Sequence, residues 1–574
     1  MNKIIKLMSF FLLPLFCNCS FAHQDGTTGT GPFEYKEIYL PEGIGEGAAK
    51  LGLNSVDEDW GIWGHNLSVV VPKNHSMTIY ASVNGSRNRE QYCFSSDQLF
   101  GYIENYIEDN FGENHTHRFA ILPNDNSFVC QCEQCVSVGN TATDASPAAF
   151  KMLERLAKRF PKHVFFSLYY LSTKSLPKEP LPENTGVLVS AMDYPLTPHE
   201  TAQEAAFTAL LKSWSQKVSR VYVWDYINNF DDYFTPYPVL NLLQRRFQIY
   251  EGANVKGIFL NGSGSAYSSF SKLKTYIIRD LMENTHQDLK ELVMKYCHEF
   301  YPVTGNEIAS YLFLVEATFN KRGKSLPLYE GVPRLMDVYL DPFEFSPFHM
   351  RMLELLPQTV GEEKEEITTL CKALAMTRLE IKRVNRHIHA DTEPLLNLLE
   401  QVPDEGIHGY SETYWSVKDY VKEYREMISH DKQFGARNLL KDKKLEALTP
   451  LDEDYNDISI LTDGQLGLPS NYHCGQMLSS ADPSLRIRIP DVSGMRRIRV
   501  SFTVNKFFHI GLPLSVTLTA GDSQVKTVTP VPSVNNPRRS TVEFIIPAGA
   551  GPLVLTIVRD KNERTMAIDE IEGL

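Results

Sequence analysis

The sequence lacks the features that mark several large functional classes. It has no basic run or arginine-rich stretch, and 57 Lys and Arg face 70 Asp and Glu, for a net charge of −13. This balance argues against nucleic acid as a partner. It also lacks HExxH, G-x-S-x-G and P-loop motifs. Beyond the N-terminus no run reaches the roughly 18 apolar residues of a membrane span, so no transmembrane segment is expected.

The N-terminal residues predict export. Residues 1–22 read MNKIIKLMSFFLLPLFCNCSFA, with lysines before an apolar stretch, and Ser20 and Ala22 fit a small-x-small cleavage site. We expect cleavage after Ala22, with lipidation of Cys17 or Cys19 as the alternative. The mature protein is then periplasmic, secreted or attached to the cell surface.

Eight short β-rich runs alternate with helical patterns over about 250 residues, which predicts a (β/α)8 TIM-like barrel over residues 32–284. The predicted strands are 33–40, 60–67, 77–84, 117–125, 163–171, 186–194, 220–227 and 256–263. Residues 285–440 are helical throughout and should form an all-α region packed on the barrel. After residue 451 hydrophobic residues alternate with period two, which predicts an all-β sandwich over 451–574.

Polar and aromatic residues gather at the ends of the predicted strands. In a barrel these ends meet at one mouth, where the chemistry of such folds takes place. Aromatic faces stack on sugar rings, while amides, carboxylates and guanidinium groups bind hydroxyls, so the mouth suits carbohydrate. The candidate substrate-binding residues are His65, Asn66, Arg87, Asn124, Tyr169, Tyr194, Trp224, Tyr226, Asn228 and Asn261.

Three aspartates are candidates for catalysis. Glycoside cleavage needs one protonated and one ionised carboxyl group. Asp125 and Asp225 form the preferred pair, and Asp193 is their rival. No cofactor is needed for this chemistry. A metal-dependent hydrolase would need several converging His and Asp ligands, and only His65 is well placed.

Four cysteines should lie close together beside the mouth. Cys130, Cys132 and Cys135 follow Asp125 directly, and Cys93 lies in the preceding loop, which should be its neighbour in space. Structural zinc, disulfides and free thiols all remain open for this group. A site closed by four cysteines leaves no open position, so a metal there would be structural.

Several of these stretches resemble a known family. FEYKEIY, WGIWGHNL, PNDNSFVCQCEQC, VYVWDYINNF and KGIFLNGS are similar to an exported bacterial family of unknown function that is described as glycoside-hydrolase-like. Its barrel resembles that of alpha-glucuronidases. The resemblance covers about residues 33–320 and implies a sugar-active barrel with Asp125 and Asp225 in its pocket. The C-terminal sandwich, ending MAIDEIEGL, looks like the galactose-binding jelly rolls appended to glycosidases.

The sequence therefore predicts a glycoside hydrolase acting on a polysaccharide or glycan fragment. The alternative is a non-catalytic carbohydrate-binding protein with a degenerate glycosidase barrel. The separation of two carboxyl groups across the mouth distinguishes them. Cleavage requires about 5–5.5 Å or about 6.5–9.5 Å.

Overall fold

The chain divides into two compact units. The computed structural model describes residues 31–574 apart from 113, 200, 402–408, 414–415, 481 and 522. The predicted signal segment, residues 1–22, lies outside the described residues. The first unit comprises the chain up to Asn228 with Tyr237–Ser265 and Phe270–Leu326. The second comprises Asn229–Pro236, Ala266–Ser269 and Pro327–Leu574. Helices predicted to follow the barrel, up to residue 326, therefore belong to the first unit.

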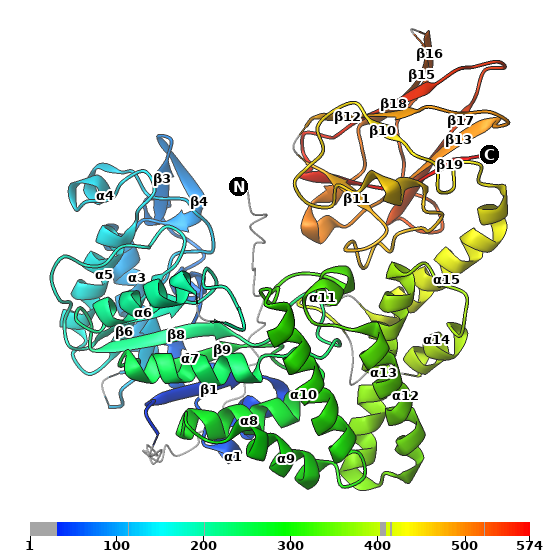
Figure 1. Ribbon diagram of the computed structural model, residues 1–574. Helices are drawn as coiled ribbons and strands as arrows, with labels where there is room; N and C mark the ends of the chain where they lie inside the picture. The colour runs from blue at the N-terminus through cyan, green and yellow to red at the C-terminus, as the bar shows by residue number, and fades with distance from the viewer. Residues whose placement is uncertain are drawn as a thin grey trace. The chain divides into compact units, whose positions relative to one another are not determined.

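A curled, fully parallel sheet of seven strands forms the centre of the first unit (Figure 1). Its order is β1-β9-β8-β7-β6-β5-β2. The strands are β1 (Tyr35–Tyr39), β2 (Trp60–Ile62), β5 (Arg118–Ala120), β6 (Val164–Tyr169), β7 (Thr185–Ser190), β8 (Arg220–Tyr226) and β9 (Gly257–Asn261). Most positions of β6 to β9 are buried on both faces, as expected for a parallel sheet covered by helices.

The prediction of eight parallel strands is wrong at the third strand. Residues 77–84 begin with a short 3-10 turn and continue as β3 (Tyr80–Val83), which pairs antiparallel with β4 (Ser86–Tyr92) outside the main sheet. Asn84 and Gly85 connect them with φ of 49° and 79°. An Asn-Gly turn with two positive φ angles matches the twist of a tight hairpin. The local turn chemistry therefore directs this run into a hairpin.

Side chains connect the two edges of the curled sheet. Trp60 Nε1 of β2 donates to the Tyr35 hydroxyl of β1 at 2.9 Å, and that hydroxyl bonds the Glu37 carboxyl. The Val56 amide, just before β2, donates to Glu37 Oε1 at 2.9 Å. Burial raises the pKa of Glu37 to about 8. We call Tyr35, Glu37, Val56 and Trp60 the seam. They connect the edge strands β1 and β2, where an eighth strand would otherwise close the sheet into a barrel.

Aromatic rings fill the space enclosed by the sheet next to the seam. Tyr35 stacks on Tyr222 with ring centroids 5.2 Å apart, and Phe166 lies 4.7 Å from Tyr222 and 4.9 Å from Trp60. The rings come from β1, β2, β6 and β8, so they tie distant strands together. Large, rigid side chains thus form one layer beneath the carboxyl ends of the strands.

Helices flank the sheet and continue beyond it. In the first unit they are α1 (Gly45–Leu51), α2 (Val56–Asp59), α3 (Asp97–Asn110), α4 (Glu133–Ser137), α5 (Ser146–Arg159), α6 (Ala202–Trp214), α7 (Leu240–Gly252), α8 (Ser271–Glu283), α9 (Leu289–Phe300) and α10 (Gly305–Arg322). Local sequence signals determine where several of these helices begin. The Ser96 hydroxyl caps α3 by accepting from the Leu99 amide, and Pro147 stands in the first turn of α5.

The second unit combines helices with two antiparallel sheets. Its helices are α11 (Val332–Val338), α12 (Pro342–Leu355), α13 (Gly361–Val384), α14 (Glu393–Glu400) and α15 (Val417–Phe434). One sheet contains β10 (Glu446–Ala447), β12 (Ser484–Ile489), β18 (Leu553–Val558), β15 (Ser515–Ala520) and β16 (Ser523–Val528). The other contains β11 (Met477–Ser479), β19 (Thr565–Gly573), β13 (Arg497–Thr503) and β17 (Arg539–Ile545), with β14 (Ile510–Gly511) beside β19.

The two antiparallel sheets share one hydrophobic core. Leu485, Ile487 and Ile489 of β12 are buried, while Arg486 and Arg488 between them are exposed. Their core partners include Val500 of β13 and other alternate residues of both sheets. The period-two pattern of the sequence therefore does form a sandwich of two sheets.

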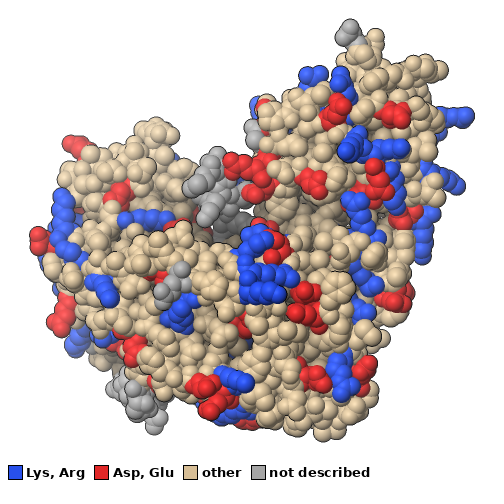
Figure 2. Space-filling model, in the orientation of Figure 1, with Lys and Arg blue, Asp and Glu red and all other residues tan. Residues whose placement is uncertain are grey.

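Charges are mixed on the surface. The face shown in Figure 2 carries acidic and basic side chains next to one another, and neither sign covers a broad area. In the described part of the chain, no helix combines the length and apolar character needed to cross a bilayer.

Candidate functional site

A group of polar and aromatic side chains lies where β2, β5, β6, β7 and β8 end, and we call it the mouth. His65 follows β2 and its Nδ1 lies 2.6 Å from the carbonyl oxygen of Pro123, which implies that Nδ1 carries the proton and donates. The His65 ring lies 6.4 Å from Tyr170, just after β6, and 6.3 Å from Trp224 of β8. The predicted convergence of these strand ends is present.

Asp125 lies within this group, in the loop after β5, and its side chain is buried. The Tyr170 hydroxyl donates to Met192 Sδ at 3.4 Å, and Asp125 lies close enough for its charge to act on this phenol. Burial raises the pKa of Tyr170, and the negative charges of Asp125 and Asp193 raise it further. Tyr226 of β8 is also buried, and Asp125 contributes to raising the pKa of its phenol. Burial therefore keeps both phenols protonated, and the nearby charge of Asp125 adds to this effect.

Stacked indole rings form the floor of the mouth. Trp63 and Trp224 lie with centroids 5.1 Å apart and planes 17° apart. Phe259 of β9 packs edge-on against both, at 4.7 and 4.9 Å. Trp224 is buried and Trp63 is half-buried, so part of this aromatic platform is open to solvent.

Three buried polar atoms at the ends of β8 and β9 have no hydrogen-bond partner among the described residues. They are Trp224 Nε1, Asn228 Oδ1 and Asn261 Nδ2. Buried polar atoms in proteins are almost always bonded, so atoms like these call for an explanation such as water or a ligand. Trp224 Nε1 and Asn261 Nδ2 are donors, and Asn228 Oδ1 is an acceptor. Such a combination can bind hydroxyl groups, which both donate and accept hydrogen bonds.

The prediction that Asp225 shares this mouth is wrong. Along β8, Trp224 and Tyr226 face the mouth, and Asp225 between them points to the opposite face. There its carboxylate forms an ion pair with Arg246 of α7 and accepts from the Tyr250 hydroxyl at 2.5 Å, and both charged side chains are fully buried. Successive residues of a strand face opposite sides. Asp225 therefore anchors α7 on the sheet.

Two predicted tyrosines also lie away from the mouth. Tyr169 packs against Trp214 of α6, with ring centroids 6.1 Å apart. Tyr194 stacks on Phe207 of α6, and the Arg246 guanidinium lies 4.0 Å from its ring. Both side chains therefore belong to the contact between the sheet and its helices.

The remaining predicted polar residues lie near the mouth but bind other parts of the chain. Arg87 of β4 donates to the Tyr80 carbonyl at 2.6 Å. Asn66 is exposed and its amide oxygen accepts from the Ser68 hydroxyl. Asn124 is held by the hairpin, because its Nδ2 donates to the Glu90 carbonyl at 2.9 Å. None of these contacts positions a group toward Asp125.

Asp193 lies beyond β7 and reaches solvent. Its side chain is 60% exposed and forms an ion pair with Lys174. Its charge acts on the phenols of Tyr169 and Tyr170. Because Asp225 is excluded, Asp193 is the remaining candidate partner for Asp125 among the predicted carboxylates.

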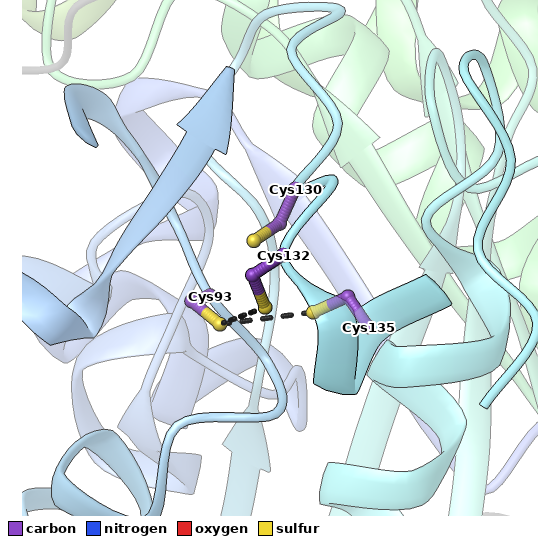
Figure 3. Close-up of side chains that lie close together, drawn as sticks. All are labelled: Cys93, Cys130, Cys132 and Cys135. Carbon is purple, nitrogen blue, oxygen red and sulfur yellow. Dashed lines mark hydrogen bonds between the residues drawn. The ribbon is translucent and has the colours of Figure 1, made fainter. Parts of the chain in front are cut away.

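The structure brings the four predicted cysteines together (Figure 3). Cys93 follows β4, Cys130 and Cys132 lie in the loop after Asp125, and Cys135 is in α4. Their sulfur atoms all lie within 4.8 Å of one another. The expected proximity of the two loops is therefore correct.

Two residues near the mouth were missed by sequence reasoning. Gln91 of β4 is buried, and its side chain accepts from the Asn124 amide at 3.0 Å and donates to the Asn124 carbonyl at 3.1 Å. Glu37 lies in the seam. An acidic residue inside the short apolar strand YKEIY is a sequence signal that Glu37 is buried and bonded. Nothing in the sequence singles out Gln91.

Comparisons with known proteins place a domain on this part of the chain. Residues 66–312 match the model of a family described as Domain of unknown function (DUF4838). Comparison with curated proteins finds no match. Among solved structures, the chain is similar to a family GH115 4-O-methyl-alpha-glucuronidase with specificity for decorated arabinogalactans, at 13% identity and a TM-score of 0.35. That alignment covers 83% of this chain and 66% of the other, just under two thirds.

Two further solved structures illustrate the range of similarity. A GH138 enzyme targeting pectin rhamnogalacturonan II shares 9% identity at a TM-score of 0.30, with 83% of this chain and 76% of that chain covered. The lectin domain of lectinolysin, complexed with Lewis B antigen, shares 12% identity at a TM-score of 0.19, with 24% and 95% covered. Glycoside hydrolases thus occur among the solved structures that the chain is similar to, and residues 66–312, from the turn after β2 to helix α10, match the DUF4838 family model.

Proposed function

We propose that this protein is an exported glycoside hydrolase that acts on a polysaccharide or glycan fragment at the mouth of the curled sheet. One observation carries the proposal. The buried Asp125 and the His65 ring, 6.4 Å from Tyr170 and 6.3 Å from Trp224, lie with the stacked rings of Trp63 and Trp224 where the strands end. A carboxyl group beside an aromatic platform suits sugar chemistry, and we assign Asp193 as the second carboxyl group that glycoside cleavage requires.

The surroundings of the two carboxyl groups suggest different roles. Asp193 is exposed and has Lys174 as its counter-ion, so we assign it the ionised role. Asp125 is buried, and burial favours the protonated form of a carboxyl group, so we assign it the transfer of a proton to the leaving oxygen. His65 is fixed through its Nδ1, which leaves Nε2 as an acceptor for a sugar hydroxyl.

The platform and the three unpartnered atoms support sugar binding. The half-buried face of Trp63 can stack on the C–H face of a pyranose. Trp224 Nε1, Asn228 Oδ1 and Asn261 Nδ2 can exchange hydrogen bonds with hydroxyl groups. Satisfying such buried groups with a ligand is favourable, because each costs about 1–3 kcal/mol when it is left unbonded.

Binding without cleavage is the second candidate, and one observation favours it. Asp225 is committed to Arg246 and Tyr250, and Asp193 is neutralised by Lys174. Asp125 would then be the one carboxyl group that bonds a sugar hydroxyl, and no acid-base pair would operate.

A hydrolysis screen separates these candidates. The full-length protein is incubated with aryl glycosides, aryl uronides and plant and host glycans, beside Asp125→Asn and Asp193→Asn. Asp109→Asn, an exposed aspartate of α3, serves as the matched control. Binding of the same glycans is measured in parallel by glycan array and calorimetry.

The proposal expects turnover in the wild type and in Asp109→Asn, with a loss of at least about 100-fold in kcat for each mouth variant. Turnover that survives both mouth variants would contradict the assignment. Binding that is lost in Asp125→Asn, without turnover of any substrate by the wild type, would favour the non-catalytic candidate. Binding that persists in all variants would direct attention to the C-terminal sandwich as a carbohydrate-binding module.

A further inference from the structure

Four cysteine sulfurs form a compact cluster beside the mouth (Figure 3). Cys93 Sγ lies 3.7 Å from both Cys132 Sγ and Cys135 Sγ, and all four sulfurs lie within 4.8 Å of one another. Zn–S bonds of about 2.3 Å in a regular tetrahedron place the sulfurs about 3.8 Å apart. The spacing of the cluster therefore fits a four-thiolate metal site.

From this geometry we infer that Cys93, Cys130, Cys132 and Cys135 bind one structural zinc ion. A pair of disulfides would divide the four sulfurs into two bonded pairs. Here Cys93 instead lies at the same distance from two partners, which is the arrangement of ligands around a shared centre. Four ligands close the coordination sphere, so the ion would have no position for water or substrate.

Hydrogen bonds to the sulfurs support thiolate ligands. The Ser82 amide donates to Cys130 Sγ at 3.2 Å. Cys135 Sγ donates to Ser95 Oγ at 3.2 Å, and once the thiol is ionised the hydroxyl becomes the donor. Donors directed at ligand atoms orient them and stabilise their negative charge, as is usual around bound metals.

The site would hold the segment that follows Asp125. Cys93 directly follows the β3–β4 hairpin, whereas the other three ligands lie five to ten positions after Asp125. The Gln131 amide donates to the Ser82 carbonyl at 2.8 Å, so main-chain bonding already joins the two segments. Zinc would fasten this segment at its far end, while Gln91 and Asn124 fasten it at its near end.

Metal and thiol analysis of the full-length protein tests the inference. The purified, gel-filtered protein is analysed for zinc, and thiols are titrated in denaturant with and without a chelator. We expect about one zinc per chain. The seven cysteines of the described chain should all titrate as thiols once the metal is chelated. Absence of zinc from protein expressed with zinc present, or the loss of four titratable thiols to disulfides, would overturn the inference.

Variants locate the ion. Cys93→Ser and Cys132→Ser should each lose zinc at least about 10-fold, whereas Cys297→Ala, a buried cysteine of α9, should retain it. Retention of zinc by both cluster variants would place the metal elsewhere. Cobalt loading of the wild type offers an assay that needs no variant. A tetrahedral thiolate site gives intense charge-transfer bands, and their absence would contradict four-sulfur ligation.

Hydrogen exchange tests the positioning role without reference to activity. Removal of zinc by a chelator should speed amide exchange in residues 124–137 and 80–95, while β7 and β8 stay protected. Unchanged exchange in both segments would show that the ion does not hold the Asp125 loop. Rescue of protection by added zinc, but not by magnesium, is the expected control result.

Discussion

Each face of the parallel sheet carries a buried aspartate, and the hydrogen-bonding surroundings of the two carboxyl groups differ. On the helix-covered face, Asp225 is fully buried and satisfied by Arg246 and Tyr250. On the mouth side, Asp125 is buried and its charge acts on the Tyr170 phenol, while polar atoms of Trp224, Asn228 and Asn261 have no partner within the described chain. A polar group with complete internal bonding stabilises the fold, whereas incomplete bonding is characteristic of a surface prepared for a ligand.

The largest expected effect comes from breaking the buried pair on the helix-covered face. Asp225→Asn leaves the Arg246 charge uncompensated inside the protein, so the free energy of unfolding should fall by about 3–5 kcal/mol. Urea unfolding followed by tryptophan fluorescence measures it, because four of the five tryptophans lie in the first unit. Asp125→Asn, the comparison on the mouth side, should lose far less. Equal losses would remove the distinction between the two faces.

The next effect concerns pH and the seam. The folded-state pKa of Glu37 is about 8, above its usual value of 4.5. Folding therefore holds a proton that the unfolded chain releases, and the stability associated with Glu37 declines as the pH rises from about 4.5 to about 8. Each unit of the shift corresponds to about 1.4 kcal/mol.

Glu37→Gln should remove this dependence, because glutamine keeps an acceptor for the Val56 amide and carries no charge. Unfolding midpoints compared at pH 5 and pH 8 should show the variant gaining stability relative to wild type at the higher pH. A constant difference between the two proteins would show that Glu37 does not titrate in this range.

A smaller loss of stability is expected where Gln91 of the β3–β4 hairpin binds the main chain of Asn124. Gln91→Ala leaves both the amide and the carbonyl of Asn124 without their side-chain partner, so it should cost about 1–3 kcal/mol. Hydrogen exchange should rise locally in residues 123–127. Glu90→Ala, at an exposed position of the same strand, serves as the control for nonspecific changes in the hairpin, and an equal loss there would contradict a specific role of Gln91.

The smallest effect is expected at the solvent-facing edge of the mouth. Lys174→Ala removes an ion pair whose two side chains are 40% and 60% exposed. Such pairs contribute at most about 1 kcal/mol, so the unfolding midpoint should barely move. If Asp193 acts in catalysis, the same substitution should nevertheless shift the pH profile of turnover. A large stability loss would indicate a structural role for this pair.

The sequence predicted the strand-helix alternation well, and its errors have identifiable physical causes. Because long buried β-rich runs leave little ambiguity, the predicted runs 163–171, 186–194, 220–227 and 256–263 contain strands β6 to β9, except that β7 begins one residue before its run. The run 77–84 is not a strand of the parallel sheet, because the Asn84-Gly85 turn directs it into a hairpin.

The candidate site was predicted in part. The cysteines converge because their loops follow neighbouring segments, and this could be read from order alone. Asp225 could have been excluded from the pattern VYVWDYI, since Trp224 and Tyr226 on one face place Asp225 on the other. The partners Arg246 and Gln91 could not be found, because contacts between distant segments depend on side-chain geometry that periodicity does not specify.

The seam has a consequence for how this fold tolerates substitution. Main-chain bonding between two strands survives most changes of side chain, because every residue except proline supplies the same donor and acceptor. Where β1 meets the segment leading into β2, the Asn54 amide donates to the Lys36 carbonyl, and the seam adds links that depend on one hydroxyl, one carboxyl and one indole. Replacing Tyr35 with phenylalanine would delete two of its links at once, so mutational robustness should be lowest along this line and highest between β6 and β7.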